Sequence, residues 1–312
     1  MTPGYQALRE GAAWLDLAGR GKIAARGEDR ARLLHAMVTN HVEQLTPGGG
    51  CYAFFLDRQG HILADVNLFR LTDRFLLDTE PENVRTVYEH LERHIIADDV
   101  ALEDVTLTLA TLAVEGPKSA SVLSALGAPV PEAPSAIADW GARLVARVDS
   151  TGAGGFFVFL PAEQREGLIR ELESAGAVAA AFEDAHAVRL ERGRPRYGED
   201  ITPDSLPQET QVQRALHFNK GCYLGQEIVE RIRTRGHVNR LLVRLALDSA
   251  EPPPSGARIL DGDSDIGAVT SSAFSPAEGR SLAFGYVRGG HERAGIRLLV
   301  GGVQADVLPP AT

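Results

Sequence analysis

The sequence predicts an α+β fold in which two related ferredoxin-like halves form one body and a small β-barrel follows. The first observation is the element order β-β-α-β, which occurs twice within residues 1–240. The second is a series of short apolar runs after residue 240, separated by turn segments such as EPPPSG, DGDSDIG and SPAEG. Such runs are typical of a barrel of about 70 residues. We therefore expect a body over 1–240, with halves of roughly 1–116 and 117–240, and a barrel over 241–312.

In the first half, a helix is predicted over 27–40, because apolar side chains between Leu33 and Val38 form one stripe. The turn DRQG separates two apolar runs, and Pro81 suits the first position of a helix. The remaining predicted elements are strands over 51–57, 61–71 and 74–80, a helix over 81–95 and a strand-rich stretch over 100–116.

The second half repeats this order around the glycine turn TGAGG. The predicted elements are a helix over 117–127, strands over 143–150 and 155–161, a helix over 163–176, a helix that starts segment 186–209 before a Gly/Pro-rich loop, and a helix over 227–236.

Composition limits the function. Lys and Arg number 32 against 42 Asp and Glu, a net charge of −10, so overall attraction to nucleic acid or an anionic membrane is not expected. The N-terminus lacks signal-peptide features, and no apolar stretch is long enough to span a membrane. Cys51 and Cys222 have no neighbouring ligand residues, which predicts no metal site, a reducing compartment and a cytoplasmic location.

Cys222 lies in the segment NKGCYLGQE, residues 219–227. Because Lys220 and Gly221 precede it, one interpretation is an accessible thiol beside a positive charge that favours the thiolate. The alternative is a small residue in a tight turn.

Two carboxylates are ambiguous from spacing alone. Asp65 interrupts an apolar strand and is either solvent-facing in a period-2 pattern or functional. Glu191 lies near a helix C-terminus between Arg189 and Arg192, which fits a surface salt bridge. It also fits a carboxylate that accepts from two adjacent N–H groups of a pterin or guanine.

A basic run follows the cysteine segment, and it is either a solvated face or an anion site. It consists of Arg231, Arg233, Arg235, His237 and Arg240.

The motif K-G-C-Y-x-G-Q-E at 220–227 resembles the signature of YgfZ-type folate-binding proteins, which are relatives of the glycine-cleavage T-protein, an aminomethyltransferase. Further resemblance lies in blocks at 37–66, 188–201 and 267–287. The resemblance implies a folate-binding α+β body with a terminal barrel, and a role in making or maintaining iron–sulfur enzymes. It places Glu191 at the pterin and Asp65 near the reacting end of tetrahydrofolate.

We also assign Asn40 and Arg240 to the folate site. Two departures from the T-protein pattern concern acids. T-proteins usually carry a pair of acids where this chain has Ala64 and Asp65, and they read TGE-x-G-x-E where this chain has Ala153 and Phe157 in the acidic positions.

The resemblance favours a folate-dependent accessory protein for iron–sulfur cluster assembly or repair, rather than a stand-alone enzyme. Because one thiol cannot hold a four-iron cluster, Cys222 would act transiently and share a cluster or sulfur species with a client protein, a second protomer or a small thiol. The residues expected to work with Cys222 are Lys220, Gly221, Tyr223, Gly225, Gln226 and Glu227.

Two alternatives remain open. One is a tetrahydrofolate-dependent transferase of aminomethyl or other one-carbon groups, which is the activity expected if the chain is an enzyme. The other is a protein of tRNA modification that binds RNA through Arg231, Arg233 and Arg235.

Overall fold

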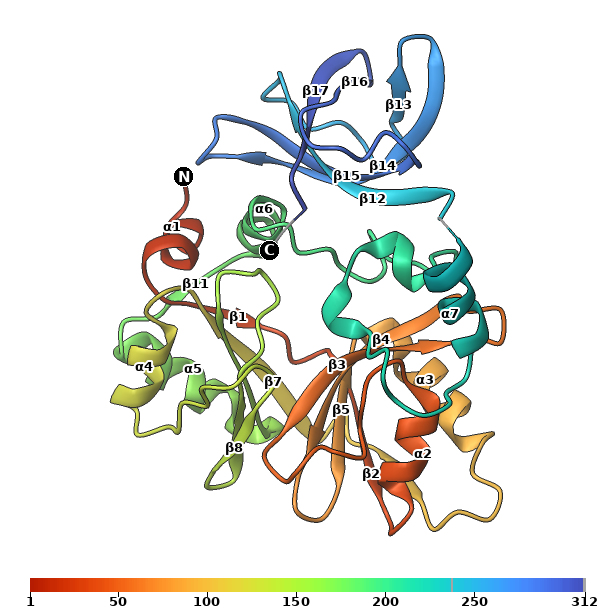
Figure 1. Ribbon diagram of the computed structural model, residues 1–312. Helices are drawn as coiled ribbons and strands as arrows, with labels where there is room; N and C mark the ends of the chain where they lie inside the picture. Colours follow the sequence, from red (N-terminus) through yellow and green to blue (C-terminus); the bar gives the residue numbers. More distant parts are fainter. Residues whose placement is uncertain (237, 311–312) are drawn as a thin grey trace.

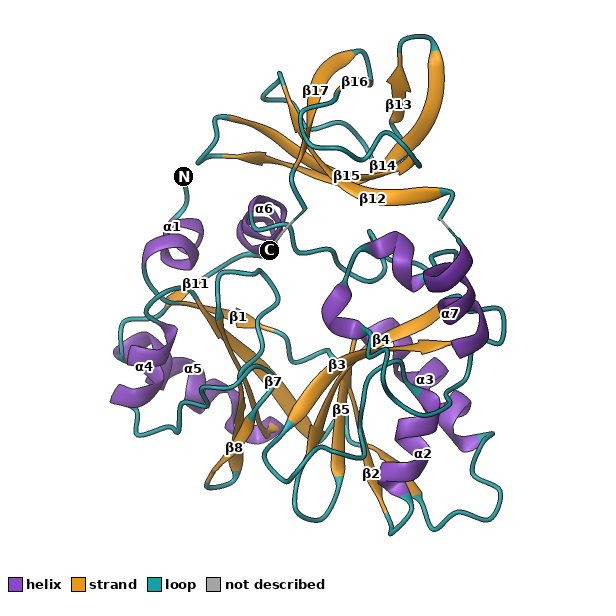
Figure 2. Cartoon of the chain, in the orientation of Figure 1, coloured by secondary structure: helices purple, strands orange, loops and turns teal. Residues whose placement is uncertain are grey.

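The computed structural model describes residues 1–236 and 238–310, and its two β-sheets lie side by side below a barrel (Figure 1). The predicted α+β class, with a two-part body and a small barrel, is confirmed. Helices flank the two sheets on their outer sides, and loops line the space between them (Figure 2).

The first sheet has five strands in the order β3-β4-β5-β2-β6. Its strands are β2 (Gly21–Arg26), β3 (Gly50–Leu56), β4 (Ile62–Arg70), β5 (Phe75–Thr79) and β6 (Ala101–Asp104). Its covering elements are α2 (Arg30–Met37), η1 (Pro81–Asn83) and α3 (Val84–Glu92).

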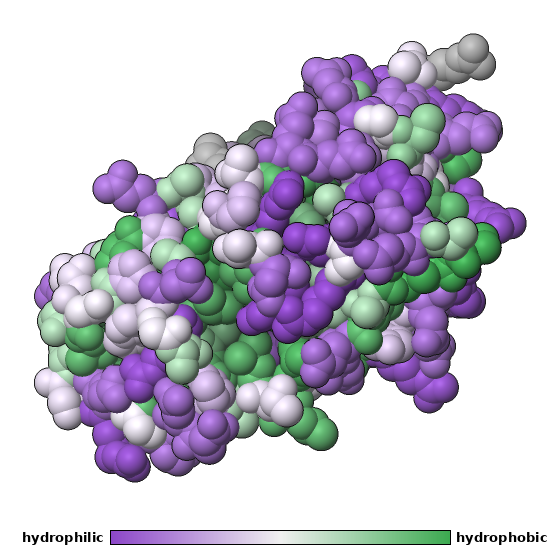
Figure 3. Space-filling view, turned by 90° about the horizontal axis from the view of Figure 1, so that it is seen from below, coloured by the Kyte–Doolittle hydropathy of each residue, from purple (hydrophilic) through white to green (hydrophobic). Residues whose placement is uncertain are grey.

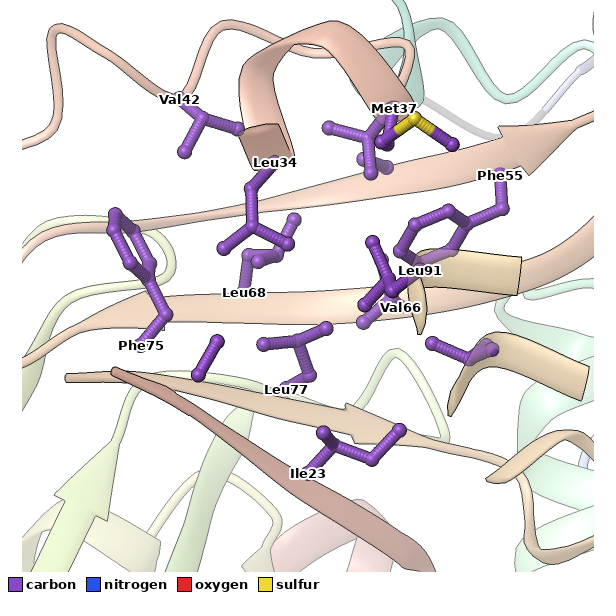
Figure 4. Close-up of a cluster of buried hydrophobic side chains, with 14 of the residues drawn as sticks. Ile23, Leu34, Met37, Val42, Phe55, Val66, Leu68, Phe75, Leu77 and Leu91 are labelled. Carbon is purple, nitrogen blue, oxygen red and sulfur yellow. The ribbon is translucent and has the colours of Figure 1, made fainter. Parts of the chain in front are cut away.

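The side-chain alternation of β4 gives this sheet two different faces. Ala64, Val66 and Leu68 pack with α2 and α3 in one buried apolar cluster, where the labelled side chains point toward one another (Figure 4). Because successive side chains of a strand point to opposite faces, Asp65 and Asn67 face away from the helices. Polar residues on an apolar strand therefore face the interior between the sheets.

The second sheet has six strands in the order β11-β1-β7-β10-β9-β8. Its strands are β1 (Ala13–Asp16), β7 (Leu109–Glu115), β8 (Ile137–Trp140), β9 (Arg143–Ala146), β10 (Gly155–Pro161) and β11 (Val178–Ala179). The helices of this part are α1 (Pro3–Glu10), α4 (Ser119–Ala125), η2 (Ala162–Gln164), α5 (Arg165–Ser174) and α6 (Phe182–Glu191).

Two strands of the predicted first half belong to the second sheet, which differs from the division predicted at residue 116. β1 and β7 pair with each other in the second sheet, and only β6 of the strand-rich stretch 100–116 joins the first sheet. The physical reason is burial: β6 is a short, mostly exposed edge strand, whereas β7 is buried on both faces and suits an interior position.

The inner faces of the two sheets meet through aromatic side chains. Phe69 of the first sheet and Phe159 of the second contact edge to face, with ring centroids 5.7 Å apart.

On the underside of the molecule, hydrophobic residues gather toward the centre and left between hydrophilic ones (Figure 3). Apolar surface thus remains open on this side of the body.

The chain after α6 returns to the first sheet and then enters the barrel. Its elements are η3 (Pro207–Thr210), η4 (Gln213–Ala215) and α7 (Gln226–Arg235). Tyr223 and Val229 of this segment pack on Phe54 and Leu56 of β3.

The barrel closes in the order β12-β15-β14-β13-β16-β17 and lies above α6 (Figure 1). Its strands are β12 (Arg240–Leu247), β13 (Arg258–Asp261), β14 (Ser264–Ser275), β15 (Arg280–Arg288), β16 (Arg297–Val300) and β17 (Val303–Leu308). Among residues 1–236 and 238–310, no helix has the length and apolarity needed to cross a bilayer.

Candidate functional site

A cavity of about 700 Å³ lies at the seam of the two sheets. Its walls come from β3, β4 and β10, from the loop between β9 and β10, from α6 and from the segment after it. Its volume falls within the range of roughly 300–1,000 Å³ that is usual for small-molecule sites.

Asp65 carries the most distinctive chemistry of this cavity. It is 9% exposed, and its Oδ2 accepts a hydrogen bond of 2.9 Å from the Tyr52 hydroxyl. Its Oδ1 is buried and has no hydrogen-bond partner among the described residues. Burial raises the pKa of Asp65 to about 6, with a further raising effect from Glu80 and a lowering effect from Arg20. A buried carboxylate with a free acceptor oxygen is a candidate proton acceptor or ligand anchor.

An ionic network lies beside Asp65. The Arg20 guanidinium donates to Asp78 at 2.9 Å and to Glu80 at 2.7 Å, and Asn67 Nδ2 donates to Asp78 at 2.9 Å. These hydrogen-bonded charges hold Arg20, Asn67 and Glu80 in fixed positions at the cavity wall.

The opposite wall contains the loop after β9, which Glu115 holds from behind. The buried Glu115 carboxylate accepts from the backbone N–H of Ser150 at 2.7 Å and of Thr151 at 3.1 Å, and from both hydroxyls. Burial raises the pKa of Glu115 to about 7, and the neighbouring Asp149 adds to this effect. The loop that faces the cavity is therefore fixed by four hydrogen bonds to one carboxylate.

Glu191 is not among the residues that line the cavity, in contrast to the role predicted for it at the pterin. Its carboxylate accepts from the Tyr5 hydroxyl and the Ser275 hydroxyl at 2.6 Å each and pairs with Arg9. The physical reason is that α6 packs against α1 and the barrel. Glu191, near the C-terminus of α6, joins these elements through a largely buried side chain that pairs with Arg9, and not through the surface salt bridge with Arg189 and Arg192 that was the alternative.

Asn40 and Arg240, also assigned to folate, are not among the residues that line the central cavity, and both have structural partners. Asn40 Nδ2 donates to the backbone oxygens of Tyr52 and Arg214, at 2.9 Å each. Arg240 donates to Glu209 at 3.2 Å, and its guanidinium lies 4.5 Å from the Tyr286 ring centroid, between body and barrel. Arg240 lines a second cavity of about 550 Å³ there.

Lys220 does not act beside the Cys222 thiol, which corrects the predicted thiolate-favouring pair. The Lys220 ammonium is buried, and it donates to the backbone oxygens of Val38 at 2.6 Å and Asn40 at 2.9 Å, and to that of His35. These carbonyls belong to the end of α2 and the residues after it, which lack helical N–H donors. Burial lowers the pKa of Lys220 to about 8.

Cys222 itself is exposed and lies outside the residues that line the central cavity. The residues after it are held in place: Tyr223 is buried, and Gly225 has φ +83° with Asp57 O only 2.7 Å from the position of an added Cβ. Gln226 Oε1 accepts from the Tyr223 N–H at 3.3 Å. The segment therefore presents one thiol on a rigid loop.

The other two residues expected to work with Cys222 are both exposed. The structure does not require glycine at position 221, because an added Cβ would have its nearest neighbour, His35 Nε2, at 3.6 Å. Glu227 lies in the first turn of α7, where a carboxylate is favourable.

The basic run is divided among different contacts. Arg231 is exposed, and Arg233 lies 4.6 Å from the Phe218 ring centroid and pairs with Glu230 at 3.3 Å. The side chain of Arg235 and the whole of His237 lie outside the described residues. Among the described residues, Arg233 and Arg240 thus have acidic neighbours that reduce a local positive field.

The family model of the GCVT N-terminal domain matches residues 2–220, and that of the glycine cleavage T-protein C-terminal barrel domain matches residues 240–309. The chain belongs to the glycine-cleavage T-protein family. Two similar T-protein relatives are the aminomethyltransferases of Rubrobacter xylanophilus, 32% identical over 91% of this chain and 78% of the relative, and of Thermus thermophilus, 31% identical over 92% and 83%.

The crystal structure of the glycine cleavage system aminomethyltransferase T from Bartonella henselae is similar throughout. It has a TM-score of 0.89 and 25% identity, and the match covers 98% of this chain and 87% of that one. The sequence predicted an accessory protein rather than a stand-alone enzyme. That prediction is wrong for this T-protein family, because its members that are similar to this chain are named as enzymes.

One of the departures from the T-protein pattern, Phe157, lies at the cavity. The Arg20 guanidinium lies 5.6 Å from the Phe157 ring centroid. An apolar ring thus occupies the position where the T-protein pattern has an acid. Asp65 is therefore the one acid, of those that the T-protein pattern places here, that lines the cavity of this chain.

Sequence reasoning missed several cavity residues. Tyr52 pairs with Asn67 across β3 and β4, so hairpin register and strand alternation together could have placed both on the face of Asp65. No sequence signal joins Arg194 or Arg214 to this strand pair, because both arrive from distant segments.

Proposed function

We propose that this protein is a tetrahydrofolate-dependent one-carbon transferase of the aminomethyltransferase type, with tetrahydrofolate bound in the central cavity. The observation that carries the proposal is Asp65, a buried carboxylate with a free oxygen in the cavity of a T-protein family member. The family binds tetrahydrofolate, and the cavity volume suits a ligand of this size.

Asp65 suits proton handling in such a transfer. With a pKa of about 6, it is largely ionised at neutral pH and still close enough to accept a proton readily. A nitrogen of tetrahydrofolate that forms a bond to the one-carbon unit loses a proton, which the free Oδ1 can receive. Tyr52 orients the carboxylate from its other oxygen.

The test is titration with tetrahydrofolate of wild type, Asp65→Ala and Asp65→Asn. We expect saturable binding in wild type and a loss of roughly 1–3 kcal/mol in Asp65→Ala, because N–H donors of the ligand lose their acceptor. Asp65→Asn should weaken binding less, since the amide keeps one acceptor. Asp73→Asn, which changes an exposed carboxylate, serves as control. Equal binding by wild type and Asp65→Ala would contradict the proposal.

Exposed Cys222 favours a second candidate function, iron–sulfur cluster maintenance as in the YgfZ-type branch. The described residues do not fit a resident four-iron cluster, which needs about four thiolates, because Cys51 is largely buried and burial raises its pKa to about 12. Any cluster would have to be shared with a client protein. Complementation of an iron–sulfur maintenance defect by wild type but not by Cys222→Ser would support this candidate.

Two further predictions belong to the proposal. Domains over 1–240 and 241–312 are supported by the two family matches, which end at 220 and begin at 240. A cytoplasmic location is supported by the two unpaired cysteines.

A further inference from the structure

Three histidine side chains lie in a row beside the part of the chain that carries Cys222. The ring centroids of His35 and His41 are 4.6 Å apart, and those of His41 and His217 are 5.2 Å apart. The rings come from α2, from the residues after it and from the chain after η4. In residues 1–236 and 238–310, no group of three His, Cys, Asp or Glu side chains has the arrangement of a metal site, which leaves proton binding as the chemistry open to this cluster.

Two of these rings accept backbone hydrogen bonds through Nδ1. The Val42 N–H donates to His35 Nδ1 at 3.3 Å, and the Asn219 N–H donates to His217 Nδ1 at 3.3 Å. Only a neutral imidazole has an acceptor nitrogen, because both nitrogens of the protonated ring carry hydrogen. Protonation of either ring therefore removes the hydrogen bond that this ring accepts.

The chain from 217 to 224, here named the thiol segment after the exposed cysteine that it carries, is held against the end of α2 close to these rings. The His217 N–H donates to the Thr39 oxygen, and the Leu224 N–H donates to the Ala36 oxygen, at 3.0 Å each. The histidine cluster therefore lies at the contact between α2 and the thiol segment.

The surroundings of the rings oppose their protonation. Burial lowers the pKa of His35 below the ordinary value of 6.5, and the charge of Lys220 lowers it further. Burial also lowers the pKa of His41, with additional lowering by the charges of His217 and Lys220. Glu43 acts in the opposite direction, but its carboxylate is about half exposed and lies 4.0 Å from His35 Nε2.

The other titratable groups next to the thiol segment do not offset a positive charge on the rings. Arg233 pairs with Glu230 at 3.3 Å, and the charge of Arg214 is opposed by carboxylates of the cavity wall. Burial raises the pKa of Cys51 to about 12, so its thiol is uncharged. Glu43 is thus the carboxylate that faces the cluster.

From this arrangement we infer that the three histidines form a proton-operated latch, which holds the thiol segment on α2 at neutral pH and releases it in acid. In the released state the rings are hydrated and take up protons more readily than in the closed state. Because the closed state binds fewer protons, its stability falls as pH falls below about 6.5. Each bound proton also adds a positive charge near the buried Lys220 ammonium. The latch is independent of the proposed one-carbon transfer and controls the mobility of the chain around Cys222.

The test is hydrogen exchange of the full-length protein at pH 7.5 and pH 5, with protection corrected for the intrinsic exchange rate at each pH. The amides of Val42, Asn219 and Leu224 should lose about tenfold or more of their protection at pH 5, whereas those of β15 in the barrel should keep theirs. Equal protection of the thiol segment at both pH values would overturn the latch. A loss that β15 shares to the same extent would overturn it as well, since it would report global unfolding.

Two substitutions separate proton binding from hydrogen bonding. His35→Asn and His217→Asn each place an amide oxygen near the former Nδ1, which can accept at either pH and takes up no proton. The double variant should be protected as wild type is at pH 7.5 and should keep this protection at pH 5. His291→Asn is the matched control, because His291 pairs with Asp261 in the barrel at 3.3 Å, and this variant should lose protection in the thiol segment as wild type does. The same loss in the double variant would refute the latch.

His41 provides a variant that removes a proton site without removing a hydrogen bond. Its buried Nδ1 has no partner in the part of the chain that the structure describes. His41→Gln should therefore keep the protection seen at pH 7.5 and reduce the loss at pH 5. If the double variant does not fold, wild type and His41→Gln decide the question, and an unchanged loss in His41→Gln would refute the three-histidine latch.

Discussion

Replacing Asp65 by asparagine should stabilise the protein at neutral pH. The pKa of Asp65 rises from an ordinary value of 3.8 to about 6 in the folded state. Between these values the folded chain keeps a proton that the unfolded chain releases, so wild-type stability falls as pH rises through this window and stays lower above it. A shift of this size corresponds to roughly 3 kcal/mol. Asparagine keeps an acceptor for the Tyr52 hydroxyl and carries no charge.

The assay is urea unfolding of wild type and Asp65→Asn at pH 4 and pH 8. We expect the variant to be more stable by up to roughly 3 kcal/mol at pH 8 and nearly equal to wild type at pH 4. Asp65→Asn should thus be more stable than wild type and bind folate more weakly, which is the usual relation when a functional charge is buried. A variant that is less stable at pH 8 would refute the view that burial makes the ionised form of Asp65 unfavourable.

Three further predictions concern Lys220, Cys222 and Glu191, which the sequence placed in the functional site. Lys220→Met should lower the free energy of unfolding by roughly 2–4 kcal/mol, because three buried carbonyls lose their donor, while the alkylation rate of Cys222 in the folded protein should not change. Cys222 should react with iodoacetamide before Cys51, whose raised pKa and burial protect it until the chain unfolds, and equal labelling in the folded state would contradict this. Glu191→Gln should weaken the contact with Arg9 and lower stability, yet leave tetrahydrofolate affinity unchanged in titration.

The fold was largely predictable because local periodicity and turn chemistry agree with it. The turn DRQG and the flanking alternation predicted the hairpin of β3 and β4, and Gly/Pro-rich turns predicted the barrel. The placement of β1 and β7 in the second sheet was not predictable. Pairing over such long separations depends on the burial of whole strands, which local patterns do not encode.

The candidate site was predictable only in part. Asp65 stood out as an acid on an apolar strand, but strand alternation alone could not distinguish a cavity from solvent on its polar face. Lys220 and Cys222 are close in sequence, yet the lysine extends to the carbonyls at the end of α2, so adjacency did not indicate contact. Glu191 pairs with Arg9 of α1, a partner 182 positions away that its neighbours in sequence do not reveal.

The most direct measurement of the central claim is turnover with tetrahydrofolate and an aminomethyl-loaded lipoyl carrier, followed as formation of methylenetetrahydrofolate. The proposed function predicts turnover by wild type, full retention in Cys222→Ser and a large loss in Asp65→Asn, since the amide cannot accept the proton. Absence of turnover in wild type, or equal turnover in Asp65→Asn, would contradict one-carbon transfer in this cavity.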